Sequence, residues 1–166
     1  MEFHEDLQYW HTHGYFYELN SQIACPLMEN LIATFEGLEG LLNIDNQSFN
    51  YLPPKAMLHF GHTDGILLFL SLLGLNKDDY SLNHDMFEES KYRKFRLSKI
   101  DPMSSNVGFL LLECEKSPLK RILTFFQEKP IKLPKCNALD CDYEIFKKIY
   151  ENDIQCKFDN ICENTE

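Results

Sequence analysis

The stretch Met57-Leu58-His59-Phe60-Gly61-His62-Thr63-Asp64-Gly65 is the most informative part of this 166-residue chain. Lys55 to Phe60 reads as a short strand, and the segment Gly61-His62-Thr63-Asp64 ends it. A strongly apolar helix is expected from Gly65 to Leu73, closed by Gly74 as its C-terminal cap. Because apolar residues run all round this helix, it should be buried on most sides.

The rest of the chain predicts further helices and strands around this unit. Helices are expected from about Asp6 to His13, Ile23 to Leu42 and Tyr143 to Ile149. Strands are expected at Tyr92 to Leu97, Val107 to Cys114 and Arg121 to Phe126. Residues 43–54 read as a loop, and residues 76–90 as a surface excursion. We therefore expect an α/β architecture, in which strands that include 55–60 and 107–114 form part of a sheet flanked by helices.

His62 is placed where a phosphate could bind. It follows a predicted strand and begins a helix, and in open α/β sheets ligands bind at that edge. The first turn of a helix offers free N–H groups and a positive dipole end, which suit a phosphate. A protonated His62 could contact a phosphoryl oxygen, and Asp64 could protonate a leaving alkoxide. The pair suits phosphate-ester cleavage, which needs charge stabilisation at phosphorus and a proton for the departing oxygen.

The same residues also allow a purely structural interpretation. Thr63 or Asp64 could cap the helix, with His62 as a loop histidine near the core. His59 alternates with the strand positions expected to be buried, which favours a structural role for it. The local pattern alone favours this interpretation.

The charge of the chain argues against nucleic-acid binding. Its net charge is -10, from 16 basic and 26 acidic residues, whereas sequence-independent nucleic-acid binding needs basic surfaces. One basic run could attract a polyanionic substrate, but a solvated strand edge is the simpler interpretation. That run consists of Lys91, Arg93, Lys94, Arg96 and Lys99. The longest apolar stretch, Ile66 to Leu75, is about half the length needed to span a bilayer, so no transmembrane segment is expected.

Cysteine content and one sequon indicate the secretory pathway. The six cysteines are an even set, clustered toward the C-terminus, which suits disulfides. Paired zinc ligands typically have about two to four residues between them. The gaps here are four and five residues and the C-terminal tail has no histidine, so disulfides are favoured over zinc. Asn46 begins an Asn-x-Ser sequon between two structured stretches and is a glycosylation candidate. No signal peptide is visible at the N-terminus. A chain truncated at its N-terminus would reconcile these observations.

The segment Phe60-Gly61-His62-Thr63-Asp64, followed by Leu67, Leu70 and Leu72-Leu73-Gly74, resembles the second signature of the histidine acid phosphatases. In that superfamily the equivalent histidine binds the phosphoryl group and a nearby acid donates the proton. The resemblance thus implies substrate binding and catalysis for His62 and catalysis for Asp64. Most members have His-Asp here, whereas the multiple inositol polyphosphate phosphatases have His, a small residue and Glu. This chain keeps the latter spacing with an acid one methylene shorter.

Similarity to the multiple inositol polyphosphate phosphatases covers nearly the whole chain, in order. The stretches that carry it are Glu5-Asp6-Leu7, Tyr9-Trp10, Gly14-Tyr15, Leu19-Asn20, Tyr92-Arg93-Lys94-Phe95-Arg96, Pro102 to Asn106, Phe109 to Cys114 and Gln127-Glu128-Lys129-Pro130. The resemblance also implies disulfides near the C-terminus. Cys136–Cys141 and Cys156–Cys162 are the local candidate pairs, because each pair is close in sequence, but the sequence alone leaves the connectivity open. Cys25 and Cys114 would then pair with each other or with partners outside this sequence.

The departure from the superfamily is the missing first signature, Arg-His-Gly-x-Arg-x-Pro, whose histidine becomes the phosphohistidine. Nothing in this chain matches it. Because the chemistry is covalent and has two steps, His62 and Asp64 lack a first step to assist. The chain is therefore expected to be a fragment, a partial gene product or a diverged non-catalytic relative that corresponds to the C-terminal part of the enzyme.

The resemblance implies a partial histidine-phosphatase fold, with residues 1–42 as the end of a helical lobe and residues 43–166 as the C-terminal part of the α/β domain. It implies hydrolysis of phosphomonoesters on inositol hexakisphosphate, with 2,3-bisphosphoglycerate as a second candidate substrate. The partner would be a small polyphosphate, and the mechanism needs no metal or organic cofactor. Two rival hypotheses are a phosphate-binding regulatory module and a structural remnant that folds poorly.

Overall fold

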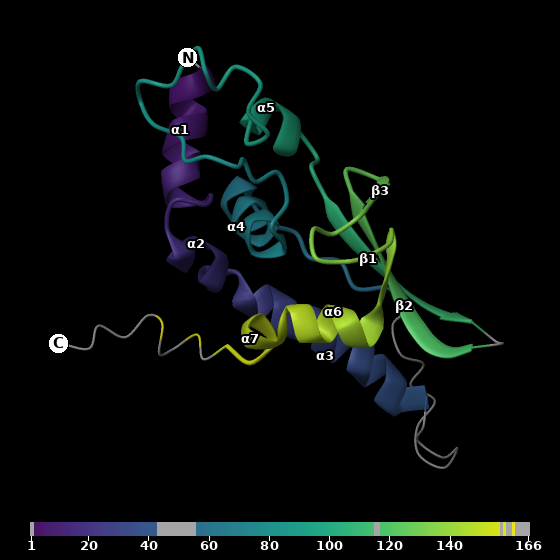
Figure 1. Cartoon of the computed structure of the whole chain (residues 1–166). Coiled ribbons are helices and arrows are strands. Elements are labelled where there is room, and N and C mark those ends of the chain that lie inside the picture. The colour runs from purple at the N-terminus through teal and green to yellow at the C-terminus, as the bar shows by residue number, and fades with distance from the viewer. Residues whose placement is uncertain (1, 43–55, 115–116, 157, 159–160, 162–166) are drawn as a thin grey trace.

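The computed structural model describes residues 2–42, 56–114, 117–156, 158 and 161 (Figure 1). The helices are α1 (Glu2–Thr12), α2 (Glu18–Ile23), α3 (Cys25–Leu42), α4 (Thr63–Leu73), α5 (Leu97–Ile100), α6 (Tyr143–Ile149) and α7 (Glu151–Ile154). The strands are β1 (Val107–Cys114), β2 (Ser117–Phe126), β3 (Lys129–Ile131) and β4 (Asp140–Asp142). The chain thus has the expected mixture of helices and strands.

Its sheet is antiparallel and is built around β2. Strand β1 pairs along one edge of β2, with Leu110 opposite Leu123. Strands β3 and β4 pair with different parts of the other edge, where Thr124 lies opposite Ile131 and Ile122 lies opposite Cys141. The sheet stands on one side of α4, and α6 follows β4 and packs against β2 (Figure 1).

Helix α4 lies at the centre of the molecule, between α1 and α2 on one side and the sheet on the other (Figure 1). Leu67, Leu70 and Leu73 are each 2% exposed or less, which confirms the burial expected from an apolar pattern that runs round the helix. The helix ends at Gly74, as predicted, because that residue takes the left-handed conformation (φ 74°) that favours glycine.

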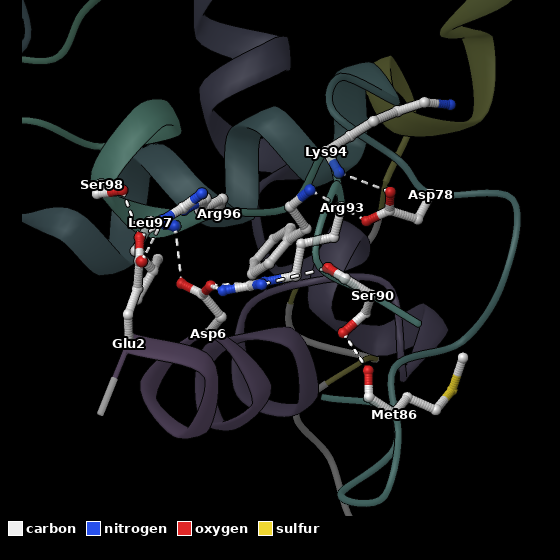
Figure 2. Close-up of polar contacts among 11 residues, drawn as sticks. Glu2, Asp6, Asp78, Met86, Ser90, Arg93, Lys94, Arg96, Leu97 and Ser98 are labelled. Atoms are coloured by element: carbon white, nitrogen blue, oxygen red, sulfur yellow. Dashed lines mark hydrogen bonds and ion pairs between the residues drawn. The ribbon is translucent and has the colours of Figure 1, made fainter. Parts of the chain in front are cut away.

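A group of polar contacts ties α1 to residues 93–98 (Figure 2). The fully buried Asp6 accepts hydrogen bonds from the Arg93 guanidinium, at 2.7 Å from Nε, and from the Leu97 N–H at 2.9 Å. Glu2 accepts two hydrogen bonds from Arg96, of 2.7 and 2.5 Å. The buried carboxylate of Asp78 accepts from the N–H groups of residues 94 and 95.

These contacts explain why the strand predicted at Tyr92 to Leu97 is wrong. Carboxylates of Asp6 and Asp78, rather than a neighbouring strand, take up N–H groups of residues 94, 95 and 97, so the segment follows an irregular path into α5. The interpretation of the basic run as a strand edge is wrong for the same reason. Its two arginines bind the carboxylates of α1, and Lys94 lies 3.5 Å from Asp79.

The strand predicted at Lys55 to Phe60 is also wrong. Residues 56–60 have no strand pairing and are exposed, and residue 55 lies outside the described part of the chain. Leu58 and Phe60 are 76% and 93% exposed, so the apolar run here does not enter the core. A strand forms only where a neighbour accepts and donates its backbone hydrogen bonds, and the described residues supply none here. The predicted loop at 43–54 lies outside the described residues.

Two disulfides link described cysteines. Cys136 pairs with Cys141, which confirms the first of the two local candidate pairs. Cys156 pairs with Cys25 and not with Cys162, so that local pair is wrong. The reason is tertiary: Cys25 begins α3, α3 packs against α7, and the two Cα atoms come within 6.1 Å. Cys162 and Asn46 lie outside the described residues.

Candidate functional site

The N-terminus of α4 carries the residues predicted for the site. His62 is the N-cap residue: its backbone is extended (φ -108°, ψ 172°), and its carbonyl accepts from the N–H groups of Gly65 and Ile66 at 3.1 and 3.4 Å. The helix therefore begins at Thr63, and the interpretation that Thr63 or Asp64 caps it is wrong. The His62 side chain makes no cap hydrogen bond and is exposed. The Asp64 side chain is 64% exposed, so both side chains stand at the surface of one helical turn.

Hydrogen bonds to the turn after α1 hold α4 in place. The Tyr15 hydroxyl lies 3.2 Å from the Leu70 carbonyl and within hydrogen-bond distance of the Leu75 carbonyl, and its single hydrogen is shared between them. Burial raises the pKa of the Tyr15 hydroxyl. The Ser71 hydroxyl donates to the His13 carbonyl at 2.8 Å. These bonds join residues 13–15 to the C-terminal part of α4 and thereby fix the turn after α1 against that helix.

His13 is the neighbour that this arrangement brings to Asp64. Its Nε2 atom lies 3.3 Å from Oδ1 of Asp64, and its side chain is 21% exposed. Its Nδ1 atom lies 2.7 Å from Oγ1 of Thr12, and its ring lies 5.2 Å from the ring of Tyr9.

The turn that carries His13 is itself tightly held. The buried side chain of Asn20 donates to the carbonyls of His11 and Gly14, at 2.9 and 3.0 Å. A Cβ atom at Gly14 would lie 2.8 Å from the backbone of Trp10, so only glycine fits there without a shift. The backbone that presents His13 is therefore well determined.

The local sequence brought His62 and Asp64 together but gave no signal for His13. His62 and Asp64 are two residues apart, so a helix start places them on neighbouring positions whatever the rest of the fold does. His13 reaches Asp64 only through the tertiary packing of α1 and α4, and no periodicity or motif marks that contact. His59 is exposed in the irregular segment 56–60, so its expected place on a half-buried strand is wrong.

The surroundings of this turn are open. Two hollows, of about 530 and 580 Å³, border Gly74 and Lys77 at the opposite end of α4.

In the described part of the chain, no group of three or more His, Cys, Asp or Glu residues is arranged to hold a metal ion. Likewise, none of the described helices is long and apolar enough to cross a membrane. The groups gathered at the start of α4 are the His62 and His13 imidazoles, the Asp64 carboxylate and the N–H groups of the first turn.

Comparisons with known proteins agree on one kind of enzyme. The chain is 32% identical to multiple inositol polyphosphate phosphatase 1 of Homo sapiens, over 98% of this chain and 34% of the relative. It is 29% identical to that of Gallus gallus, over 98% of this chain and 36% of the relative. It is 28% identical to multiple inositol polyphosphate phosphatase 1 of Dictyostelium discoideum, over 97% of this chain and 32% of the relative.

No family model matches the chain, and no solved structure matches it. The matched share of each relative, about one third of its length, agrees with the expectation that this chain corresponds to their C-terminal part. Along nearly its whole length, this chain is similar to the multiple inositol polyphosphate phosphatases.

Proposed function

We propose that this chain is the phosphoryl-binding and proton-donating part of a histidine-type phosphatase of the multiple inositol polyphosphate phosphatase kind. The substrate is inositol hexakisphosphate, with 2,3-bisphosphoglycerate as a second candidate. One observation carries the proposal: His62 and Asp64 are both exposed on the first turn of α4, in a chain that is similar to such phosphatases over almost its full length.

The proposed chemistry divides between the two side chains. The N–H groups and positive dipole end of α4 attract a phosphate, and a protonated His62 contacts a phosphoryl oxygen. Asp64 gives its proton to the ester oxygen as the P–O bond breaks, so that the product leaves as an alcohol. These steps use no metal or organic cofactor.

The nucleophile in this proposal is the histidine of an Arg-His-Gly-x-Arg-x-Pro signature, which the present sequence does not contain. The open surface around His62 suits a site whose other wall comes from a further polypeptide segment. We propose residues 1–42 as the end of a helical lobe and 43–166 as the C-terminal part of the α/β phosphatase domain.

The secretory pathway is the proposed location: the endoplasmic reticulum lumen, the cell surface or the extracellular space. Two disulfides among the described cysteines support it, because such bonds persist in oxidising compartments. The sequon at Asn46 is compatible with it.

The second candidate is a non-catalytic phosphate-binding relative or an inactive fragment. The absence of the Arg-His-Gly signature from this sequence favours it. Such a protein keeps the phosphate site at His62 and releases no phosphate.

The test measures binding of inositol hexakisphosphate by calorimetry and release of phosphate, first with the purified chain. A chimera in which this chain replaces the matching third of the human relative is the second sample. We expect His62→Ala to weaken binding about 10-fold or more, as the loss of a charge-assisted hydrogen bond does. Asp64→Asn should leave binding in place and lower release. His59→Ala is the matched control, because His59 is an exposed histidine three residues away.

The outcomes separate the hypotheses. Release by the chimera that requires His62 and Asp64 but not His59 supports the hydrolase. A folded chimera that binds the substrate through His62 and releases nothing supports the non-catalytic relative. Absence of any binding that depends on His62 contradicts both and leaves the structural remnant.

A further inference from the structure

Three side chains from α1, the turn after it and α4 form a continuous row of contacts. The Thr12 hydroxyl lies 3.0 Å from the Gln8 carbonyl and 2.7 Å from Nδ1 of His13. On the far side of the ring, Nε2 of His13 lies 3.3 Å from Oδ1 of Asp64. The row therefore runs from a backbone carbonyl to the carboxylate proposed as the acid.

Only one placement of hydrogens satisfies both contacts of Thr12. A hydroxyl has a single hydrogen, and the Gln8 carbonyl can only accept, so the hydroxyl donates to Gln8. Its oxygen must then accept from His13, which places a hydrogen on Nδ1. Because Nδ1 is taken up by Thr12, Nε2 is the ring nitrogen that remains to form a hydrogen bond with Asp64.

We infer that His13 is a positioning residue for Asp64: it holds Oδ1 and shares a proton with it, so that Oδ2 is the oxygen presented to the substrate. The inference rests on the proposed function. It assigns to the site a third side chain, which acts through Asp64 and does not itself touch the substrate.

The proton step balances as follows. The O–H bond of Asp64 breaks as an O–H bond forms on the leaving oxygen, which keeps the electron pair of the broken P–O bond. The resulting carboxylate keeps the hydrogen bond that Nε2–H of His13 donates to Oδ1, in a ring that is a cation at this step and holds its Nδ1 hydrogen toward Thr12. A proton from solvent then restores the O–H bond at Oδ2. The Asp64 side chain is 64% exposed, so solvent reaches it.

Few other groups face this ring in the described part of the chain. From α1, Tyr9 lies with its ring 5.2 Å away. From α4, Asp64 is the charged residue in contact with the ring, and the Ser71 hydroxyl donates to the backbone carbonyl of His13. His62, two residues before Asp64, is the other titratable group on that turn.

The kinetic test compares two substrates that differ in their need for a proton. It uses the chain or, if the chain alone releases no phosphate, the chimera. The leaving group of inositol hexakisphosphate is an alkoxide, which needs the proton. The leaving group of 4-nitrophenyl phosphate is a phenolate that is stable without it. His13→Ala should lower kcat on the first substrate about 10- to 100-fold with little change in KM, and on the second less than about threefold. His13→Gln, whose amide can donate to Oδ1 but carries no charge, should recover part of the loss.

Two controls follow from the structure. His11→Ala should match the wild type, because the His11 ring stacks on Phe16 and takes no part in the row of contacts from Thr12 through His13 to Asp64. In an Asp64→Asn background, His13→Ala should add no further loss, because the two residues act as a unit. An equal loss on both substrates, or additive losses in the double variant, would show a merely structural role.

A second measurement needs no activity and separates this inference from the proposed function. The ¹⁵N signals of the His13 ring in the folded chain should show hydrogens on both nitrogens of the cationic ring and on Nδ1 of the neutral ring, and Thr12→Val should shift the neutral ring toward the form protonated at Nε2. Asp64→Asn should change the Nε2 signal. A neutral ring protonated at Nε2 in the wild-type chain, or a ring that does not respond to Asp64→Asn, overturns the inference even if the enzyme is active.

Discussion

Asp6 has none of its surface exposed, and both of its carboxylate oxygens are engaged. The Arg93 guanidinium, itself 7% exposed and 5.3 Å from the ring of Phe3, donates to one oxygen, and the Leu97 N–H donates to the other. A buried charge is tolerated only when it is paired and hydrogen-bonded. This single residue therefore determines where α1 meets the segment before α5.

Replacement of Asp6 should destabilise the chain strongly. In Asp6→Asn the Arg93 charge stays buried without its counter-ion, and the free energy of unfolding should fall by about 3–5 kcal/mol. Asp79→Asn is the matched control, because its carboxylate is 94% exposed and 3.5 Å from Lys94. It should change the stability by less than about 1 kcal/mol. Urea unfolding of both variants decides the matter, and equal effects would contradict the role given to the buried pair.

The lowered pKa of Glu2 should make the stability of the chain depend on pH. Hydrogen bonds from Arg96 and then Ser98 lower the pKa of Glu2 from 4.5 to about 2. Because the folded-state pKa is depressed, this contribution to stability is complete above pH 4.5 and is lost as the pH falls toward 2. The difference in free energy of unfolding between wild type and Glu2→Gln should thus be constant above pH 4.5 and shrink below it. Arg96→Gln should remove the same part of the pH dependence, and if it does not, Arg96 is not the cause.

At the scale of elements, replacement of glycine by alanine should have opposite effects on stability at the end of one helix and inside another. Gly74 ends α4 with φ 74°, where a side chain is strained, so Gly74→Ala should lower the stability by about 1 kcal/mol. Gly37 lies inside α3 with no atom within 4 Å of an added Cβ. Gly37→Ala should raise the stability by about 0.5–1 kcal/mol, because alanine favours the helix. Thermal unfolding of the two variants tests this, and shifts of the same sign would contradict it.

Elements with strong local signals were predictable from the sequence. Helix α6 and strand β1 have the predicted bounds, Tyr143–Ile149 and Val107–Cys114. At α6 the signal is the helical spacing of its apolar residues, and the structure adds an N-cap, because the Asp142 side chain accepts from two N–H groups of the first turn. At β1, eight residues that begin with Val-Gly-Phe-Leu-Leu-Leu suit a paired strand, and β2 follows close enough to pair with it.

Elements that depend on distant partners were not predictable. The segments 55–60 and 92–97 both have strand-like composition, but a strand needs a neighbour, and carboxylates from far along the chain bind the second segment instead. The site divides in the same way. His62 and Asp64 share one short motif and were predicted together, whereas His13 meets Asp64 only after α1 and α4 have packed.

At the scale of the whole molecule, links between distant parts of the sequence hold the chain together. The contacts of Figure 2 join α1 to residues 93–98, and the Cys25–Cys156 disulfide joins the start of α3 to the end of α7. The Tyr15 and Ser71 hydrogen bonds join the turn after α1 to α4. The candidate site lies where α1 and α4 meet, so its geometry depends on these links rather than on any local element.

The two disulfides should therefore differ in their effect on stability, because they close loops of very different size. Cys25 and Cys156 are 131 residues apart, and Cys136 and Cys141 are five apart. Loop-closure entropy in the unfolded chain predicts a loss of about 5 kcal/mol when the first pair is changed to alanine and about 2 kcal/mol for the second. Urea unfolding of the two double variants, each with its remaining disulfide oxidised, measures the difference. If the short pair mattered as much as the long one, strain or packing in the folded state would outweigh loop closure, and the link between α3 and α7 would not be the main covalent restraint among the described residues.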